Sequence, residues 1–188
     1  RAWTCLNGIV RSLPCYLWGL RIGATLAAQM STELSRVSGL LLWQPVICGE
    51  IFLNQFLRIR LAGEMLADRG IKNNTKHLRE ILRRGEVVEV GGFGLSSVMA
   101  RELTDVKLSE SRPYCPVAWF EVGAMMGDGI SHAGQTVLDA WGESFASCVT
   151  ATVSGDPFWI TQEITECRDL LALTRSVFDH WEGRLHET

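Results

Sequence analysis

The chain has 188 residues, of which 47% are hydrophobic and 21% are charged, proportions that suit one globular domain with a sizeable core. Its formal net charge of -3 gives no sign of the basic surface that nucleic acid normally requires, so nucleic acid is not an expected partner. No apolar run reaches the roughly 18 residues of a transmembrane segment. The six cysteines include no C-x-x-C pair and no zinc-like spacing with His. We therefore expect no metal, no cofactor, and reduced thiols in a cytoplasmic protein.

Periodic apolar residues in the N-terminal third predict helices and strands in alternation. A helical stripe over 2–13 is closed by Pro14. The continuous apolar run from Leu40 to Ile47 suits a strand buried on both faces, as in a parallel sheet covered by helices. With the strand and helix before it, this run completes one right-handed crossover unit. We expect strands over 15–18 and 40–47, helices over 2–13 and 24–36, and a turn over 37–39.

The middle of the chain, about 48–115, is more charged and less regular than the segments that flank it. Its longest element is an amphipathic helix over 50–69, and a short basic helix over 77–84 follows a polar loop. Residues 86–90 alternate like a strand that the glycines of 91–94 break, and 95–103 return to helix. This composition predicts a cap inserted over a binding site.

From Pro116 onward the pattern of a parallel sheet returns. Strands are expected over 116–122 and 147–153, with helices over 135–142 and 164–178 and a polar tail beyond them. The fold class expected from the whole order is α/β, a mostly parallel sheet with helices on both faces. Because the chain begins with Arg1 inside a helical pattern, we expect it to be a fragment of a longer protein.

The segment Trp18–Gly23 has the form of a nucleophile elbow, the tight turn that holds a reactive side chain between a strand and a helix. Such a turn needs small residues two places before and two places after its apex, and Gly19 and Gly23 fill both. The apex itself is Arg21, where Ser, Cys or Asp is required. Because a guanidinium is not a nucleophile at any accessible pH, this position decides whether the protein does chemistry.

Several segments together resemble the exosortase A system-associated hydrolases, type 2, of the α/β-hydrolase superfamily. The resemblance rests on L-W-G-L-R-I-G-A at 17–24 and L-L-W-Q-P-V at 41–46, and extends to F-L-R-I-R-L-A at 56–62, G-E-V-V-E-V-G-G-F at 85–93 and G-D-P-F-W-x-T-x-E at 155–163. It implies a partial α/β-hydrolase domain over 1–188 that lacks its N-terminal strands, with a cap insertion at about 48–115. It further implies a bacterial protein encoded near a protein-sorting and exopolysaccharide system, with a hydrolase reaction assigned by fold.

A hydrolase of this fold needs, after its nucleophile, an acid and then a histidine, each in a loop after a later strand. Asp128 lies where the acid is expected, although Asp between glycines is also a common turn residue, and Glu121 in the preceding strand is the alternative. The loop 155–159, where the histidine is expected, contains none. The histidines lie elsewhere, at His77, His132, His180 and His186. Two of the three triad members are therefore missing, and no catalytic residue is assigned.

Binding is the function that could remain at the elbow. The N–H of Ile22 lies at a helix N-terminus, which favours anions, and Arg21 adds a charge with bidentate geometry for carboxylate or phosphate. Trp159 is a candidate to face this site. The expected ligand is a small anionic molecule, such as an acidic lipid or sugar intermediate. The alternative is that Arg21 forms a buried ion pair with Asp128 or Asp156.

Three functions stay open at this point. The first is a degenerate hydrolase-fold protein that binds or scaffolds in the exosortase and exopolysaccharide pathway. The second is a working ester or thioester hydrolase that uses another nucleophile, such as Ser96 or a residue before Arg1. The third is a non-functional remnant of a truncated reading frame. Neither a protein partner nor an oligomeric state follows from the sequence.

Overall fold

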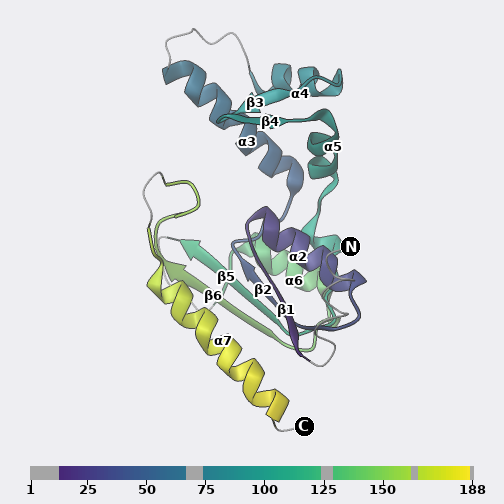
Figure 1. Cartoon of the computed structure of the whole chain (residues 1–188), viewed down its shortest axis with the longest axis vertical. Coiled ribbons are helices and arrows are strands. Elements are labelled where there is room, and N and C mark those ends of the chain that lie inside the picture. Colours follow the sequence, from purple (N-terminus) through teal and green to yellow (C-terminus); the bar gives the residue numbers. More distant parts are fainter. Residues whose placement is uncertain (1–12, 67–73, 124–128, 162–164, 187–188) are drawn as a thin grey trace. The chain divides into compact units, whose positions relative to one another are not determined.

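The computed structural model describes residues 13–66, 74–123, 129–161 and 165–186 (Figure 1). The chain divides into two compact units, which we call the first unit (1–45 with 109–188) and the second unit (46–108). The predicted cap at about 48–115 overlaps the second unit, and its role as a cover over a binding site stays a prediction. Within the described ranges, every helix is too short or too polar to span a bilayer.

The first unit is built on a parallel sheet. Its described strands are β1 (Cys15–Leu20), β2 (Val37–Trp43), β5 (Val117–Gly123) and β6 (Cys148–Ser154). Their order across the sheet is β1-β2-β5-β6, and each neighbouring pair runs in the same direction. Leu20 pairs with Trp43, and Trp43 pairs with Phe120, so the carboxyl ends of these strands meet along one edge. The predicted parallel sheet is confirmed.

Helices cover both faces of this sheet, as the sequence predicts (Figure 1). They are α2 (Ile22–Glu33), α6 (His132–Trp141) and α7 (Arg168–His186), and the short 3-10 helix η1 (Leu108–Glu110) precedes β5. Leu41 and Trp43 of β2 share one buried cluster with Trp181 of α7. On the other face, the ring of Trp119 lies 5.8 Å from that of Trp141 in α6. The strands are therefore buried from both sides, which explains their continuous apolar runs.

Residues 37–39 begin β2 and do not form the turn that the sequence predicts. The turn lies earlier, over 35–36, shortly after the end of α2. Gly39 is needed within the strand because a Cβ there would lie 2.7 Å from the Trp181 ring. A glycine that the local sequence presents as a turn signal thus marks the close approach of α7 to the sheet.

The last helix continues beyond its predicted end at residue 178. α7 reaches His186, so the expected polar tail is helical up to that residue. Trp181 in this extension stacks on Tyr16 of β1 at 5.4 Å, beside Phe178, whose ring meets Tyr16 edge-on at 5.3 Å. Tertiary packing therefore stabilises helix where the sequence indicates only a polar tail. Residue 164, where this helix was expected to begin, lies outside the described residues.

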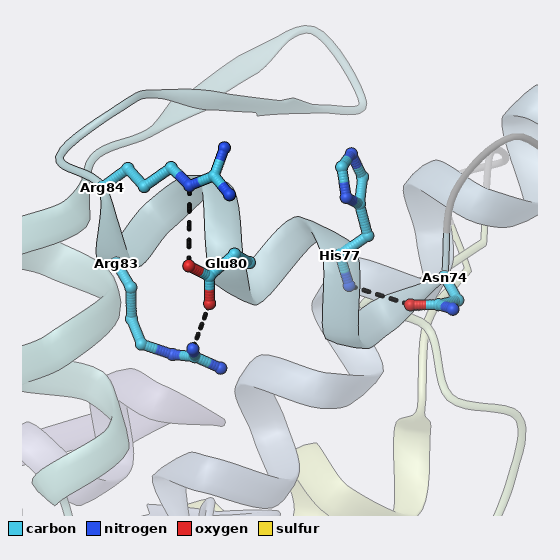
Figure 2. A network of polar contacts seen from close by, with 5 residues as sticks. All are labelled: Asn74, His77, Glu80, Arg83 and Arg84. Atoms are coloured by element: carbon cyan, nitrogen blue, oxygen red, sulfur yellow. Dashed lines mark hydrogen bonds and ion pairs between the residues drawn. The ribbon is translucent and has the colours of Figure 1, made fainter.

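The second unit combines helices with a small hairpin. Its elements are α3 (Gly49–Leu66), α4 (Thr75–Arg83), β3 (Val88–Val90), β4 (Phe93–Leu95) and α5 (Ser97–Asp105). A buried apolar cluster joins them, with Leu57 of α3 and Leu78 of α4 fully enclosed. α4 begins at Asn74, whose Oδ1 accepts the N–H of His77 at 2.8 Å (Figure 2). This cap satisfies one of the N–H groups that a helix start leaves unpaired.

Gly91 and Gly92 form the turn of a hairpin where the sequence predicts only the end of a strand. Val90 pairs with Phe93 in antiparallel register, which leaves two residues in the turn. Their φ angles are 57° and 85°. A two-residue turn with positive φ at both positions matches the twist of its strands and strongly favours glycine. Phe93–Leu95 is therefore β4, and the helix expected from residue 95 begins at Ser97.

Candidate functional site

Arg21 lies at the apex of the turn between β1 and α2, at the carboxyl edge of the sheet. Its backbone has φ 56° and ψ -124°, a conformation that a residue with a side chain adopts only under tertiary constraint. The Arg21 N–H donates to the carbonyl of Trp43 at 2.9 Å, which fastens the turn to the neighbouring strand. This strained strand-to-helix turn has the geometry of a nucleophile elbow.

The two glycines of the elbow have different roles. A Cβ on Gly19 would lie 2.3 Å from the carbonyl carbon of Gly23 and 2.4 Å from the nitrogen of Ala24, so only glycine fits there. A Cβ on Gly23 would meet nothing within 4 Å in the described structure. The sequence predicts that both positions need a small residue. In the structure the steric demand falls on Gly19, because its Cα faces the backbone at the start of α2.

The Arg21 side chain brings together two segments that are far apart in the sequence. Its Nη1 donates to the carbonyl of Gln44 at 3.3 Å, and its Cζ lies 5.5 Å from the centre of the Trp159 ring. The second contact is a cation–π interaction. Burial lowers the pKa of the Arg21 guanidinium, which nevertheless keeps its proton at neutral pH. Arg21 and Trp159 therefore lie side by side, as two members of the predicted site.

No carboxylate among the described residues pairs with the Arg21 guanidinium. Asp156, one of the two proposed partners, is exposed and forms no ion pair with Arg21. Asp128, which is both the other proposed partner and the expected acid, lies outside the described residues. A half-buried cation without an anionic partner is costly to desolvate, so this position favours an anion from outside the described part of the chain.

The first turn of α2 adds a second source of positive potential beside Arg21. The helix has no side-chain cap, and its first bonds to the Arg21 carbonyl come from the N–H groups of Ala24 (3.0 Å) and Thr25 (3.3 Å). The N–H groups of Ile22 and Gly23 consequently have no partner within the described structure. Unpaired N–H groups at a helix N-terminus attract anions through their own dipoles and the dipole of the helix.

Gln44 organises this edge of the sheet and is not among the predicted site residues. It has a φ of 42°, its N–H donates to the Phe120 carbonyl at 2.7 Å, and its Oε1 accepts the N–H of Val122 at 2.7 Å. It thereby ties the end of β2 to β5 and turns its own carbonyl to Arg21. The sequence does carry a signal for Gln44, which is the lone amide in an apolar run and stands directly before Pro45. Because a buried polar group needs hydrogen-bond partners, such a residue indicates a structural or functional role.

Glu121, the alternative acid, is buried and bonded to the residue that begins α6. Its Oε2 accepts the N–H of Ser131 at 2.9 Å, while its Oε1 accepts the Ser131 hydroxyl at 3.0 Å and the Trp119 indole N–H at 3.2 Å. Ser131 is also the N-cap of α6, where its hydroxyl oxygen accepts the N–H of Gly134. The carboxylate is therefore engaged by donors that fix the start of α6.

No side chain of a described histidine forms a hydrogen bond with a serine, a carboxylate or Arg21. The loop after β6 contains no histidine in the sequence. The side chain of His186 lies outside the described residues. The other three side chains are exposed, on α4, α6 and α7: His77, His132 and His180. Within the described part of the chain, the elbow thus combines a positive charge and open N–H groups without the acid–histidine pair that activates a serine.

No protein-family model and no curated protein matches the sequence. Solved structures do match. The α/β hydrolase GrgF from Penicillium sp. sh18 has a TM-score of 0.53 and 13% identity, over 96% of this chain and 69% of GrgF. The esterase domain of a Rhodothermus marinus protein has a TM-score of 0.45 and 16% identity, over 80% of this chain and 55% of that domain. Est1E from Butyrivibrio proteoclasticus has a TM-score of 0.45 and 15% identity, over 82% of this chain and 58% of Est1E.

The chain therefore spans little more than half the length of the Rhodothermus marinus domain and of Est1E. The likeness to GrgF covers nearly the whole chain and shows that it has the α/β-hydrolase fold. At 13% identity the likeness concerns the fold and carries no reaction with it.

Proposed function

We propose that this chain belongs to an α/β-hydrolase-fold protein whose elbow binds an anionic group at the place where hydrolases of this fold hold a nucleophile. The observation that carries the proposal is the environment of Arg21. Its guanidinium lies against Trp159 at 5.5 Å and has no carboxylate partner among the described residues. The missing histidine in the loop after β6 supports binding over serine hydrolysis.

A carboxylate or a phosphate suits this edge because it can accept hydrogen bonds from two sources at once. The N–H of Ile22 is one donor, and the planar fork of Arg21 supplies the others. A hydrogen bond to a charged group contributes about 1.5–3 kcal/mol. An aromatic or apolar body attached to the anion would lie against the ring of Trp159. The proposed ligand is therefore a small organic anion.

The motif resemblance at 17–24 and 41–46 supports a more specific setting, the exosortase and exopolysaccharide system, with an acidic lipid or sugar intermediate as the ligand. A cytoplasmic location is part of the same proposal. It agrees with the free thiols of the described cysteines, since disulfides are rare in reducing compartments. These cysteines are Cys15, Cys48, Cys115, Cys148 and Cys167.

Titration calorimetry with phenyl phosphate tests the proposal. Arg21→Gln removes the charge with little change in volume, and it is expected to weaken binding at least about tenfold. Arg36→Gln is the matched control, because Arg36 is exposed in the turn after α2 and has no ion pair within the described structure. Its affinity should stay within about twofold of the unsubstituted chain. Equal affinities for all three proteins would contradict the proposal.

A hydrolase with another nucleophile is the competing function, and ester turnover separates the two. The Oγ of Ser96 accepts the N–H of Met99 at 3.2 Å as the N-cap of α5, which is a structural role. No described histidine hydrogen-bonds to it. We expect no turnover of short-chain p-nitrophenyl esters and no labelling by a serine-directed phosphonate. Turnover that Ser96→Ala abolishes would establish the esterase and overturn the binding proposal.

A further inference from the structure

A cavity of about 380 Å³ lies between α3, α4 and α5, entirely within the second unit. Apolar side chains form part of its wall, among them Leu53, Leu82 and Val98. The polar part of the wall includes three arginines and one carboxylate: Arg79 and Arg83 from α4, and Arg101 and Asp105 from α5. Its volume falls within the range of about 300–1,000 Å³ that is usual for small-molecule sites. An apolar wall with three arginines against one carboxylate is a composition that suits an anion carrying an apolar chain.

One edge of the Arg79 guanidinium has hydrogen-bond donors that lack acceptors within the described residues. Its Nη1 bonds to Oε1 of Glu50 at 3.0 Å, and the side chain is only 25% exposed. Its Nε and Nη2 are buried and have no hydrogen-bond partner within the described residues. These two nitrogens form one edge of the planar guanidinium, the edge that can hold both oxygens of a carboxylate or phosphate. Because buried donors without partners are costly, an acceptor at this edge would be strongly favoured.

The other two arginines of the wall, Arg83 and Arg101, are incompletely neutralised by carboxylates. Figure 2 shows that Arg83 and Arg84 both contact the one carboxylate of Glu80, so two cations share a single anion. Arg101 is exposed and forms no ion pair within the described structure, although Asp105 also lines the cavity. The second unit as a whole carries more Arg and Lys than Asp and Glu, whereas the complete chain is acidic.

We propose that this cavity, the arginine cavity, binds an amphiphilic anion: a carboxylate or phosphate head on a short apolar chain. The head would bind the Nε–Nη2 edge of Arg79 and the charge of Arg101, and the chain would lie on Leu53, Leu82 and Val98. Because the edge of Arg79 is covered, its side chain must turn towards the cavity as the anion enters. That turn exchanges two unsatisfied donors for a bidentate hydrogen bond. The inference is independent of the elbow, which lies in the first unit.

The test uses the whole chain in the Arg21→Gln background, which keeps the elbow out of the measurement. Hexyl phosphate and hexanoate are titrated, with inorganic phosphate as the head alone and hexanol as the chain alone. Methyl resonances of Leu53, Leu82 and Val98 report occupation of the cavity. We expect saturable shifts with at least one amphiphilic anion, and binding at least about tenfold weaker for phosphate and hexanol, because each retains half of the contacts. The tighter of the two amphiphiles identifies the head group.

Substitutions then assign the head contacts. Arg79→Lys keeps a positive charge beside Glu50 but has no bidentate edge, and it is expected to weaken hexyl phosphate or hexanoate about tenfold. Arg101→Gln, at an exposed position where folding is not at risk, should weaken binding about threefold to tenfold. Arg58→Gln is the control, because Arg58 is exposed on α3 away from the cavity wall, and it should leave the affinity unchanged.

Two results would overturn the inference. One is the absence of saturable methyl shifts with both amphiphilic anions. The other is binding that Arg79→Lys and Arg101→Gln leave as tight as Arg58→Gln does, because the arginines would then contribute nothing to recognition. Failure of this inference would not contradict the proposal for the elbow. That proposal is tested separately, by the effect of Arg21→Gln in the first unit on the affinity for phenyl phosphate.

Discussion

Arg21 has φ 56° and ψ -124°, and a residue with a side chain adopts such a conformation at a cost of about 1–3 kcal/mol. The bond from its N–H to the Trp43 carbonyl and the close approach of Gly19 to Gly23 hold it there. The turn is strained although the residue at its apex, Arg21, is not a nucleophile. This conformation places the guanidinium of Arg21 and the N–H of Ile22 at the same edge of the sheet.

The steric difference between the two elbow glycines gives a matched pair of substitutions. Gly19→Ala is expected to lower the free energy of unfolding by at least about 2 kcal/mol, because its Cβ would lie 2.3 Å from backbone atoms that cannot move without opening the turn. Gly23→Ala meets nothing within 4 Å and should change it by less than about 1 kcal/mol. Urea unfolding followed by tryptophan fluorescence measures both. Equal losses would refute the close approach at Gly19.

The buried thiol of Cys115 makes the folded chain less stable at alkaline pH. Burial raises the pKa of its thiol to about 11, from an ordinary value near 9 in the unfolded chain. Between these values the unfolded state loses the proton and the folded state keeps it, so stability falls as the pH rises. We expect this thiol to remove about 2 kcal/mol between pH 8.5 and pH 10.5. The comparison is urea unfolding of the unsubstituted chain and Cys115→Ala at both pH values. The same pH dependence in both proteins would contradict the burial of this thiol as its cause.

Elements with a local signal could be predicted from the sequence, and those decided by distant partners could not. The apolar runs of β2 and β5 predict buried parallel strands, and the sheet confirms them. By contrast, Gly39 belongs to a strand because Trp181 lies against it, and α7 extends because Trp181 stacks on Tyr16. Neither partner is visible in the local sequence. The hairpin of β3 and β4 was missed because its strands are short and two adjacent glycines also signal a loop.

The hairpin gives an element-level test. Gly92 has a φ of 85°, so Gly92→Val should destabilise the chain by about 1–2 kcal/mol, since a β-branched residue is strongly disfavoured at positive φ. Gly91 has a φ of 57°, where Asn is well tolerated in two-residue turns, and Gly91→Asn should cost less than about 0.5 kcal/mol. Unfolding midpoints in urea compare the two variants. Equal unfolding midpoints for Gly92→Val and Gly91→Asn would contradict the two-residue turn with positive φ angles.

Across the whole molecule, the fold was more predictable than the site. The order of strands and helices indicates a parallel sheet, and the likeness to GrgF shows the α/β-hydrolase fold. The spacing of its glycines predicts the elbow, and the sequence also offers Trp159 as a residue that faces it. Gln44 was missed, because its three bonds join strands that lie far apart in the sequence. Whether a carboxylate pairs with Arg21 likewise depends on which residues of distant loops lie beside it. The local sequence does not specify those neighbours.

The indole N–H resonance of Trp159 tests the central claim most directly, because it reports binding at the place where the charge lies. The resonance is identified by its loss in Trp159→Phe, and phenyl phosphate is titrated into the labelled chain. We expect this resonance to shift saturably in the unsubstituted chain, since the ring lies 5.5 Å from the Arg21 guanidinium. In Arg21→Gln the resonance should remain but should no longer shift. A resonance that does not move with phenyl phosphate, or that moves equally in Arg21→Gln, would contradict an anion-binding elbow.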